Sequence, residues 1–392
     1  MKYNFDEIID RRGTNSLKWD IAENELPMWV ADMDLRAAPE IINAIKLRAE
    51  HGVFGYSVVP DEWYDAYINW WKTRHNVEYR KDELIFSAGV VPTISSCVRK
   101  LTTAGENVLL MPPVYNILYN SIKNNGRKVR ECPLVYANGE YGIDWELLER
   151  CLADPQTTLM LLCNPHNPVG KIWDKETLAL IGELAYNNGV VVLSDEIHCD
   201  ITDPGCEYVP FMSVSEKRAD NSVICVSPTK AFNLAGLQTS AVVVRNARLR
   251  HKVWRALNTD EVAEPNAFAV QAAVAAFEHG GDWLDELREY LYENKRTVSE
   301  FLRAELPQIK LIPSQATYLL WLDCSELKMP AEELQKHLRE TTGLYLSSGH
   351  IYGFGDSFMR MNIACPRELV RDGLDRLKRA VHLFDSEIVQ SR

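Results

Sequence analysis

The fold is decided by TLMLLCNPHNPVG (residues 158–170), VVVLSDEIH (190–198) and SVICVSPTKAFN (222–233). Each stretch starts as a short apolar run and ends in polar residues. Such runs are typical of buried strands in a parallel sheet. The polar residues that follow are therefore expected at the carboxyl edge of the sheet, where open α/β proteins bind ligands.

Further short β-branched runs surround these three, and helical patterns alternate with them. The runs lie at residues 84–87, 107–111, 128–132 and 240–244. Residues 175–187 repeat apolar side chains at helical spacing and end before Gly189. This alternation predicts an α/β fold with a mainly parallel central sheet flanked by helices.

The pattern changes after Gly281. A long helix with an apolar stripe is predicted over 282–306, closed by Pro307. Predicted strands follow at 310–312, 317–323, 344–347 and 358–363, with helices at 331–341 and 367–384. We expect a smaller α+β domain over 282–392, a large domain over 51–281, and an N-terminal segment over 1–50 that joins the small domain.

Composition excludes several classes of protein. The 392 residues are 46% apolar and 25% charged, as expected for a globular chain of one large or two coupled domains. A formal net charge of -12 disfavours nucleic-acid binding, and no apolar run is long enough to span a membrane. The first 12 residues lack the apolar core of a secretory signal, and the nine cysteines show no paired spacing. We expect nine free thiols and a cytoplasmic protein.

Common catalytic and ligand-binding motifs are missing. The sequence has no G-x-G-x-x-G, G-x-x-x-x-G-K-[ST], H-E-x-x-H or G-x-S-x-G motif, and its nine histidines form no ligand-spaced cluster. We therefore expect no metal site. The candidates that remain are the polar residues at the strand ends.

Asn167, Asp195 and Lys230 follow three successive apolar runs. Each has an ordinary alternative: a turn for Asn167, a structural ion pair or helix cap for Asp195, and an exposed loop position for Lys230. A lysine among apolar neighbours at this edge can instead have the lowered pKa needed for Schiff-base chemistry. The joint pattern is more specific than any one of the three residues.

With these three residues in place, nearly the whole chain resembles the fold type I pyridoxal 5'-phosphate (PLP) enzymes of the class I/II aminotransferase superfamily. LPMWVADMD (26–34), HGVFGY (51–56), SDEIHCD (194–200) and MRMNIACPR (359–367) closely resemble the MalY/PatB group of carbon–sulfur β-lyases. The resemblance implies an aspartate-aminotransferase-like fold and PLP as the cofactor.

The resemblance also implies roles around the PLP ring. Lys230 would bind PLP covalently and act as the base that removes the α proton of the substrate. Asp195 would pair with the pyridine nitrogen, and Asn167 would donate a hydrogen bond to the ring oxygen. Tyr115 would stack on the ring, although a core aromatic is its alternative.

The phosphate of PLP is expected at a helix start formed by Gly89, Val90 and Val91, because free backbone N–H groups there favour an anion. Ser227 and Thr229 could add hydroxyl donors. Tyr56 matches a family tyrosine that reaches the phosphate in the neighbouring subunit. The resemblance thus implies a homodimer with shared active sites.

The substrate side of the predicted site centres on Arg360. Its guanidinium fork suits the α-carboxylate of an amino acid, and a surface ion pair is the alternative. By resemblance, Trp29, Val30 and Ala31 would line the substrate entrance, and Asn167 would also contact the substrate.

Two positions depart from the usual aminotransferase pattern. Gln238 stands where an arginine normally binds the phosphate, and His198 stands where a tyrosine is common. Both departures are in keeping with the lyase group. His198 is expected beside the cofactor, with a structural role next to an acid as its alternative.

The sequence thus predicts β-elimination from cystathionine or a related cysteine S-conjugate, an amino-acid thioether, to give a thiol, pyruvate and ammonia. An aminotransferase using the same residues is one alternative. A regulatory protein is another, because a member of the family represses a sugar regulon by binding its activator.

Overall fold

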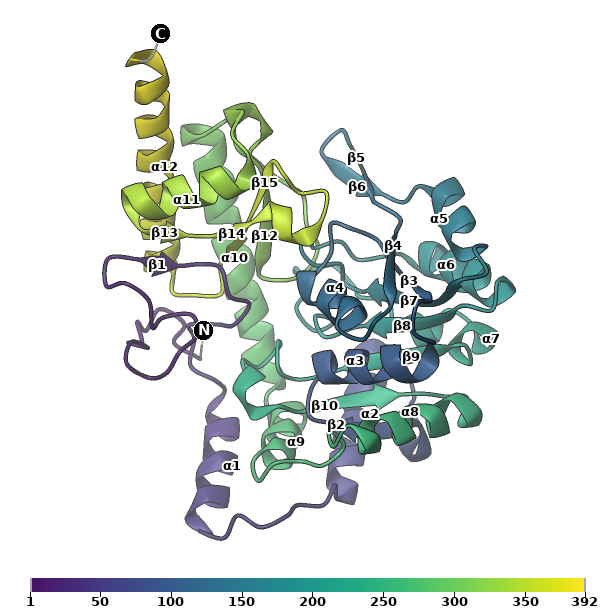
Figure 1. The fold of residues 1–392 in the computed structure, drawn as a ribbon. Coiled ribbons are helices and arrows are strands. Elements are labelled where there is room, and N and C mark those ends of the chain that lie inside the picture. Colours follow the sequence, from purple (N-terminus) through teal and green to yellow (C-terminus); the bar gives the residue numbers. More distant parts are fainter. Residues whose placement is uncertain (1, 391–392) are drawn as a thin grey trace.

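A computed structural model describes residues 2–390 of the chain, with side chains up to residue 384. Its centre is a seven-stranded sheet in the order β2-β10-β9-β8-β7-β3-β4 (Figure 1). The strands are β2 (Leu84–Ser87), β3 (Asn107–Leu110), β4 (Lys128–Glu131), β7 (Thr157–Cys163), β8 (Val191–Asp195), β9 (Ser222–Val226) and β10 (Ser240–Val243). Neighbouring strands from β4 to β9 are parallel, and β10 is antiparallel to both of its neighbours. The predicted, mainly parallel sheet is confirmed.

Both faces of this sheet are covered by helices, because successive side chains of a strand point to opposite faces. In β7, Leu159 and Leu161 pack into a core with helices α3, α4 and α8, whereas Met160 and Leu162 pack into a second core with α2, α5, α6 and α9. The helices of this part are α2 (Asp61–His75), α3 (Val90–Leu101), α4 (Asn116–Lys123), α5 (Trp145–Leu152), α6 (Lys175–Asn187), α7 (Glu216–Ala219), α8 (Ala247–Thr259) and α9 (Ala269–His279). A short hairpin, β5 (Val135–Ala137) and β6 (Glu140–Gly142), extends beside β4.

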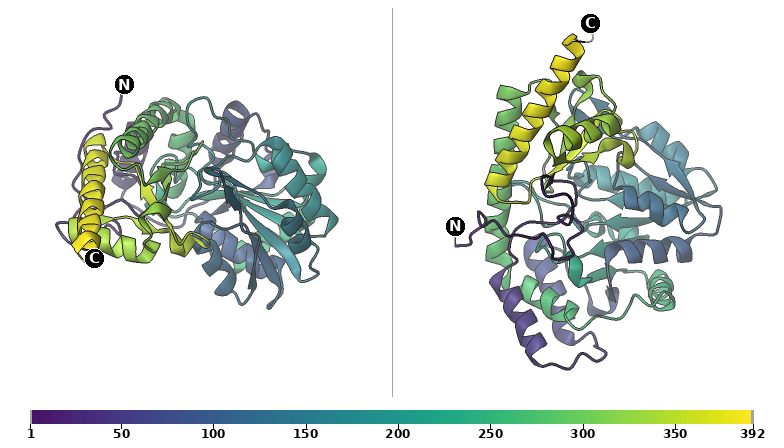
Figure 2. Two further views of the ribbon diagram at one scale, coloured as in Figure 1. Left: turned by 90° about the horizontal axis from the view of Figure 1, so that it is seen from above. Right: turned by 60° about the vertical axis from the view of Figure 1, so that its left-hand side comes forward.

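The C-terminal part begins with the long helix α10 (Gly281–Glu305), which runs past both parts of the molecule (Figure 1). A four-stranded antiparallel sheet follows, in the order β11-β12-β15-β14. Its elements are β11 (Lys310–Leu311), β12 (Leu319–Asp323), β14 (Ser347–Ser348), β15 (Phe358–Asn362), α11 (Ala331–Thr342) and α12 (Arg367–Gln390). The two views in Figure 2 show this smaller layer beside the large sheet.

Two of the strands predicted in this part differ from the structure. β12 begins two residues later than predicted, and Thr317, with φ of 69°, lies outside the extended region. The run at 344–347 is divided into β13 (Leu344–Tyr345) and β14, because β13 pairs with the N-terminal strand β1 (Leu26–Pro27) and β14 pairs with β15.

The N-terminal segment touches both parts of the molecule. β1 pairs in parallel with β13 of the C-terminal part, while α1 (Pro39–Glu50) packs against α9 of the larger part. Within the irregular stretch between β1 and α1, Ala31 lines a cavity together with Asn167, Asp195 and Lys230, which lie at the carboxyl ends of β7, β8 and β9.

Two expectations drawn from composition can be compared with the structure. All nine cysteines are free thiols, as predicted. Within residues 2–390, none of the helices combines the length and the apolar character needed to cross a bilayer.

Candidate active site

The carboxyl ends of β7, β8 and β9 meet at one cavity of about 230 Å³. Strand pairing places Cys163 of β7 opposite Asp195 of β8, and Asp195 opposite Cys225 of β9. Most of the predicted site residues line this cavity: Ala31, Gly89, Val90, Val91, Tyr115, Asn167, Asp195, His198, Thr229 and Lys230. The sequence motifs therefore converge in space.

Lys230 extends from the loop after β9, and its Nζ donates a hydrogen bond of 2.5 Å to the carbonyl oxygen of Ala31. Removal of the amine from water, together with the positive charge of Arg360, lowers the pKa of Lys230 to about 8. A lysine of this pKa is partly unprotonated near neutral pH, as covalent and base chemistry both require.

Asp195 is buried at the end of β8, where its Oδ1 accepts a hydrogen bond of 3.2 Å from the backbone N–H of Ile197. Burial raises the pKa of this carboxyl group to about 6. Within the described residues it makes no ion pair. A buried acid facing a cavity in this way suits a ligand that carries a protonated ring nitrogen.

Arg360 lies on β15 and is buried, with 4% of its surface exposed. It donates hydrogen bonds from Nη1 to Oδ1 of Asn167 (3.3 Å) and from Nη2 to the carbonyl oxygen of Trp29 (2.7 Å), and its guanidinium lies over the ring of Tyr352. Among residues 2–390, Nε of Arg360 has no hydrogen-bond partner and no carboxylate pairs with the group. The surface ion pair considered as its alternative is therefore not formed, and the arginine is available for an anionic ligand.

The helix start predicted to bind phosphate is present. Gly89 precedes α3, whose first residues Val90 and Val91 line the cavity with Thr229. Free N–H groups at the first turn of this helix favour an anion. Ser227 lies behind Thr229: its Oγ is hydrogen-bonded to Thr229 Oγ1 (2.7 Å) and donates to the carbonyl oxygen of Thr239 (2.7 Å), and it is not among the residues lining the cavity.

His198 lines the cavity, and its ring packs edge-on against Tyr318. Burial, with the nearby charges of Lys230 and Arg360, lowers the pKa of His198 to about 3, so the imidazole is neutral. In the described part of the chain, its Nδ1 has no hydrogen-bond partner. Among the described residues no acid pairs with His198, so the alternative of a structural partner to an acid is not formed.

Besides Arg360 and Ser227, three predicted residues lie outside the cavity lining: Trp29, Val30 and Tyr56. The Trp29 ring stacks on Tyr345, and the carbonyl oxygens of Trp29 and Val30 accept hydrogen bonds from Arg360 and Asn362. Tyr56 is fully exposed on the irregular stretch between α1 and α2. Its predicted role concerns a neighbouring subunit and stays a prediction.

Other residues around the cavity were not proposed from the sequence. Gln238, noted above only as a departure, lines the cavity with Thr239, Cys163 and Ile197. Asn362 was also missed. It follows Arg360 by two residues, and side chains two apart in a strand share one face, so this spacing could have indicated that Asn362 lies on the same side of β15 as Arg360.

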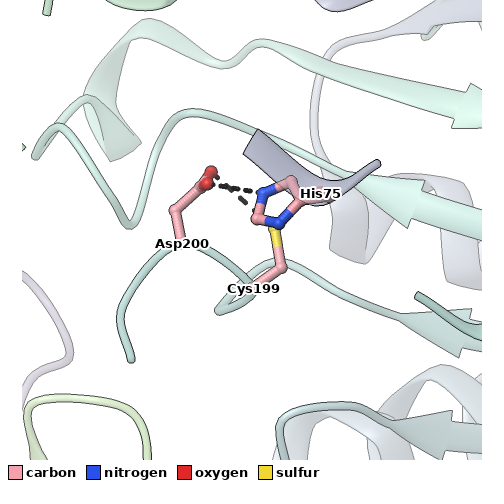
Figure 3. Close-up of side chains that lie close together, drawn as sticks. All are labelled: His75, Cys199 and Asp200. Atoms are coloured by element: carbon pink, nitrogen blue, oxygen red, sulfur yellow. Dashed lines mark hydrogen bonds and ion pairs between the residues drawn. The ribbon is translucent and has the colours of Figure 1, made fainter. Parts of the chain in front are cut away.

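Three side chains able to bind metal, His75, Cys199 and Asp200, lie close together outside the cavity (Figure 3). The Asp200 carboxylate is hydrogen-bonded to His75 Nε2 (2.8 Å), Trp70 Nε1 (3.0 Å) and the Cys199 thiol (3.7 Å). Burial and the charge of Asp200 raise the pKa of Cys199 well above its usual range, so the thiol stays protonated. The cluster satisfies its own polar groups, and the absence of a metal site stays a prediction.

The fold, the strand-end lysine and aspartate, and the helix N-terminus together define the fold type I class of PLP enzymes. The chain belongs to the family described as "Aminotransferase class I and II", whose profile matches residues 22–377.

Proteins of similar sequence match this chain over nearly its full length. Cystathionine beta-lyase PatB of Bacillus subtilis is 42% identical, over 96% of this chain and 100% of that protein. Protein MalY of Escherichia coli is 33% identical, over 97% and 99%. The crystal structure of cystalysin from Treponema denticola, which contains a pyridoxal 5'-phosphate cofactor, superposes with a TM-score of 0.95 at 32% identity, covering 97% of this chain and 99% of that one.

Proposed function

We propose that this protein is a PLP-dependent carbon–sulfur β-lyase that cleaves cystathionine or a related cysteine S-conjugate to a thiol, pyruvate and ammonia. The observation that carries the proposal is the buried guanidinium of Arg360, which has no acid partner in the described chain and lies beside the cavity of Lys230. The full-length similarity to a cystathionine β-lyase supports the lyase over the aminotransferase and the regulatory alternatives.

The cavity fits PLP. The carboxyl group of Asp195 suits the pyridine nitrogen, and the start of α3 with Thr229 suits the phosphate. Because Arg360 holds Oδ1 of Asn167, the amide nitrogen of Asn167 is the group left to donate to the ring oxygen. When bound, PLP supplies a carbonyl for the substrate amine and an electron sink for the electrons released with the α proton.

The chain's own residues then divide the remaining work. Arg360 binds the α-carboxylate and orients the substrate, and Nζ of Lys230 takes the α proton. Loss of that proton is followed by cleavage of the Cβ–S bond, whose electron pair leaves with the sulfur; the sulfur takes up a proton, which the Lys230 amine can return, and departs as a thiol. Water then converts the three-carbon fragment into pyruvate and ammonia.

The direct test measures pyruvate and free thiol released from L-cystathionine by the purified, PLP-loaded protein, with no 2-oxo acid added. We expect the two products in equal amounts, and none from Lys230→Ala. No thiol release, together with transfer of the amino group to an added 2-oxo acid, would support the aminotransferase instead. A regulatory function would survive in Lys230→Ala.

We also propose that two copies form a homodimer in which Tyr56 reaches the partner's phosphate site. Tyr56 is fully exposed, and Val53, Phe54 and Val58 on the same stretch are each more than half exposed. Water rarely surrounds so many apolar side chains on one short segment unless a partner covers them.

Mixing two inactive variants tests this arrangement. A Tyr56→Ala subunit keeps Lys230, and a Lys230→Ala subunit keeps Tyr56. A shared site predicts that unfolding and refolding the two together regains activity above the sum of the separate variants. Activity that stays at that sum, or a monomer by light scattering, would exclude it.

The remaining expectations extend the same proposal. The division near residue 281 is supported by the separate sheets on either side of α9 and α10, and the division at residue 51 is proposed with it. A cytoplasmic location is supported by nine unpaired thiols, which reducing compartments preserve.

A further inference from the structure

The irregular segment 28–35 crosses between the lysine loop and β15, and its carbonyl groups are unusually well satisfied. It has no regular ladder, so its polar backbone groups need other partners. Every carbonyl oxygen from residue 28 to 33 accepts a hydrogen bond. The backbone N–H of Asn362 donates to Met28, and the side chain of Asn362 donates to Val30 and Asp32. Trp29 accepts from the side chains of Ser347 and Arg360, and Ala31 accepts from those of Lys230 and Tyr318. Met33 accepts from the side chains of Arg11 and Asn233.

Two of these donors are the cationic groups of the proposed active site. The Trp29 carbonyl holds Arg360 at 2.7 Å, and the Ala31 carbonyl holds Lys230 at 2.5 Å. The positions of both cations therefore depend on where the backbone of segment 28–35 lies.

Asn362 fixes this backbone on the side of Arg360. It is 1% exposed and lies two residues after Arg360, on the same face of β15. Its Nδ2 donates to the carbonyl oxygens of Val30 (2.5 Å) and Asp32 (2.6 Å), the residues on either side of Ala31. Its own Oδ1 accepts from the backbone of Ala364 at 2.8 Å, which fixes the orientation of the amide.

Asn233 performs the corresponding function on the side of Lys230, three residues further along the same loop. Its Nδ2 donates to the carbonyl oxygens of Met33 and Leu35, both at 3.0 Å, and its Oδ1 accepts from the N–H of Met33 at 3.1 Å. The left-handed backbone of Asn233, with φ of 58°, is one that asparagine tolerates better than most residues.

The geometry points to Asn233 and Asn362 as positioning residues: they clamp segment 28–35 so that its Trp29 and Ala31 carbonyls hold Arg360 and Lys230 in place. Each cation and its asparagine come from the same element and bind the same segment. The inference rests on the proposed function for its kinetic consequences, and on the contacts alone for its structural ones.

The two asparagines should affect different steps. Asn362 shares β15 with Arg360, so its loss should weaken the grip on the substrate carboxylate and act mainly on KM. Asn233 shares the loop of Lys230, so its loss should misplace the amine and act mainly on kcat. A role in folding alone would produce neither of these separate effects.

The test compares Asn362→Ala and Asn233→Ala with the native PLP-bound enzyme. We expect kcat/KM for cystathionine to fall about tenfold or more in each, the effect expected from losing two hydrogen bonds. Hydrogen exchange of the amides in segment 28–35 should accelerate in both variants. Asn362→Asp, which keeps the shape and the acceptor but loses the donors, should show the same faster exchange.

Asn221→Ala is the matched control. Its Nδ2 also donates to a backbone carbonyl, that of Val190, but it precedes β9 at the opposite edge of the sheet. It should keep native kcat/KM and native exchange in segment 28–35. The clamp is refuted if both test variants keep native exchange there, or if Asn221→Ala changes the kinetics equally. If the native enzyme releases no thiol, the proposed function fails while the exchange data still decide the clamp.

Discussion

Nζ of Lys230 lies 2.5 Å from the carbonyl oxygen of Ala31, 199 positions away in the sequence. The contact joins the lysine loop after β9 to the irregular N-terminal segment that runs beside β15. It gives the amine an acceptor inside the site, while burial and the charge of Arg360 still lower its pKa to about 8.

This pKa predicts a pH-dependent stability for the PLP-free protein. The folded chain releases the Lys230 proton near pH 8 and the unfolded chain near pH 10.5. Between these values the unfolded state binds more protons, so the free energy of unfolding should rise with pH. At pH 7, Lys230→Met should be up to about 3 kcal/mol more stable than the native chain, and the difference should vanish above pH 10.5. Urea denaturation at pH 7, 9 and 10.5 measures it; a constant difference would contradict the prediction.

Asp195→Asn should separate stability from activity. The folded carboxyl group keeps its proton up to about pH 6 and the unfolded one up to 3.8, so native stability should fall as pH rises between these values. At pH 7.5 the PLP-free variant should be up to about 3 kcal/mol more stable, because a neutral amide replaces a buried carboxylate. Its activity with PLP should drop about 100-fold or more, because an amide does not stabilise a protonated ring nitrogen.

Asp200→Asn is the contrasting control for that experiment. Asp200 is as buried as Asp195, but it accepts hydrogen bonds from Trp70 and is hydrogen-bonded to His75. Its replacement should destabilise the protein at pH 7.5. If both asparagine variants change stability in the same direction, burial alone does not explain the pKa of Asp195.

Much of this site could be predicted from the sequence because its residues mark the ends of apolar runs. Asp195 ends β8, Asn167 and Lys230 lie in the short loops that follow β7 and β9, and parallel strands end at one edge. The start of α3 was predictable for the same reason. Local pattern and strand order are enough to bring these residues together.

Contacts between distant segments could not be predicted in this way. Arg360 meets Asn167 across 193 positions, and neither residue carries a local signal for the other. Ser227 looked like a phosphate donor beside Lys230, yet it is hydrogen-bonded behind Thr229. Hydrogen-bond partners of irregular backbone depend on the whole packed fold, so segment 28–35 showed its role only in three dimensions.

An ionic cluster that joins two acids of segment 28–35 to Lys18 and Arg11 should be important for stability. Lys18 is 1% exposed and pairs with Asp34 (2.7 Å) and Asp32 (3.4 Å), while Arg11 pairs with both acids. Lys18→Met should destabilise the protein by about 3 kcal/mol or more, because it leaves buried carboxylate charge less compensated. The double variant Lys18→Met, Asp34→Asn should be less destabilised than the sum of the single ones. Additive effects in urea denaturation would show that the two groups do not interact.

Cys206 should be the thiol that reacts in the folded protein. It is the cysteine of intermediate burial, whereas the other eight are buried. A disulfide reagent should therefore modify one thiol quickly in the native protein and nine after denaturation, and Cys206→Ser should remove the fast phase. Burial raises the pKa of Cys206, so the rate should increase with pH above 8. Fast modification that persists in Cys206→Ser would contradict the assignment.

Arg360→Lys tests the carboxylate grip. A lysine keeps the positive charge but lacks the fork that lets Arg360 bind Asn167 and the Trp29 carbonyl while leaving Nε for a ligand. We expect KM for cystathionine to rise about 10-fold to 100-fold with a smaller change in kcat, the loss expected for one bidentate contact. Arg367→Lys is the matched control, because Arg367 also lies over a tyrosine ring, that of Tyr290, but outside the cavity. In Arg360→Lys, kcat/KM for cystathionine should also exceed that for an S-conjugate of cysteamine, which has no α-carboxylate, by a smaller factor than in the native enzyme. An unchanged KM together with unchanged discrimination would mean that another group binds the carboxylate.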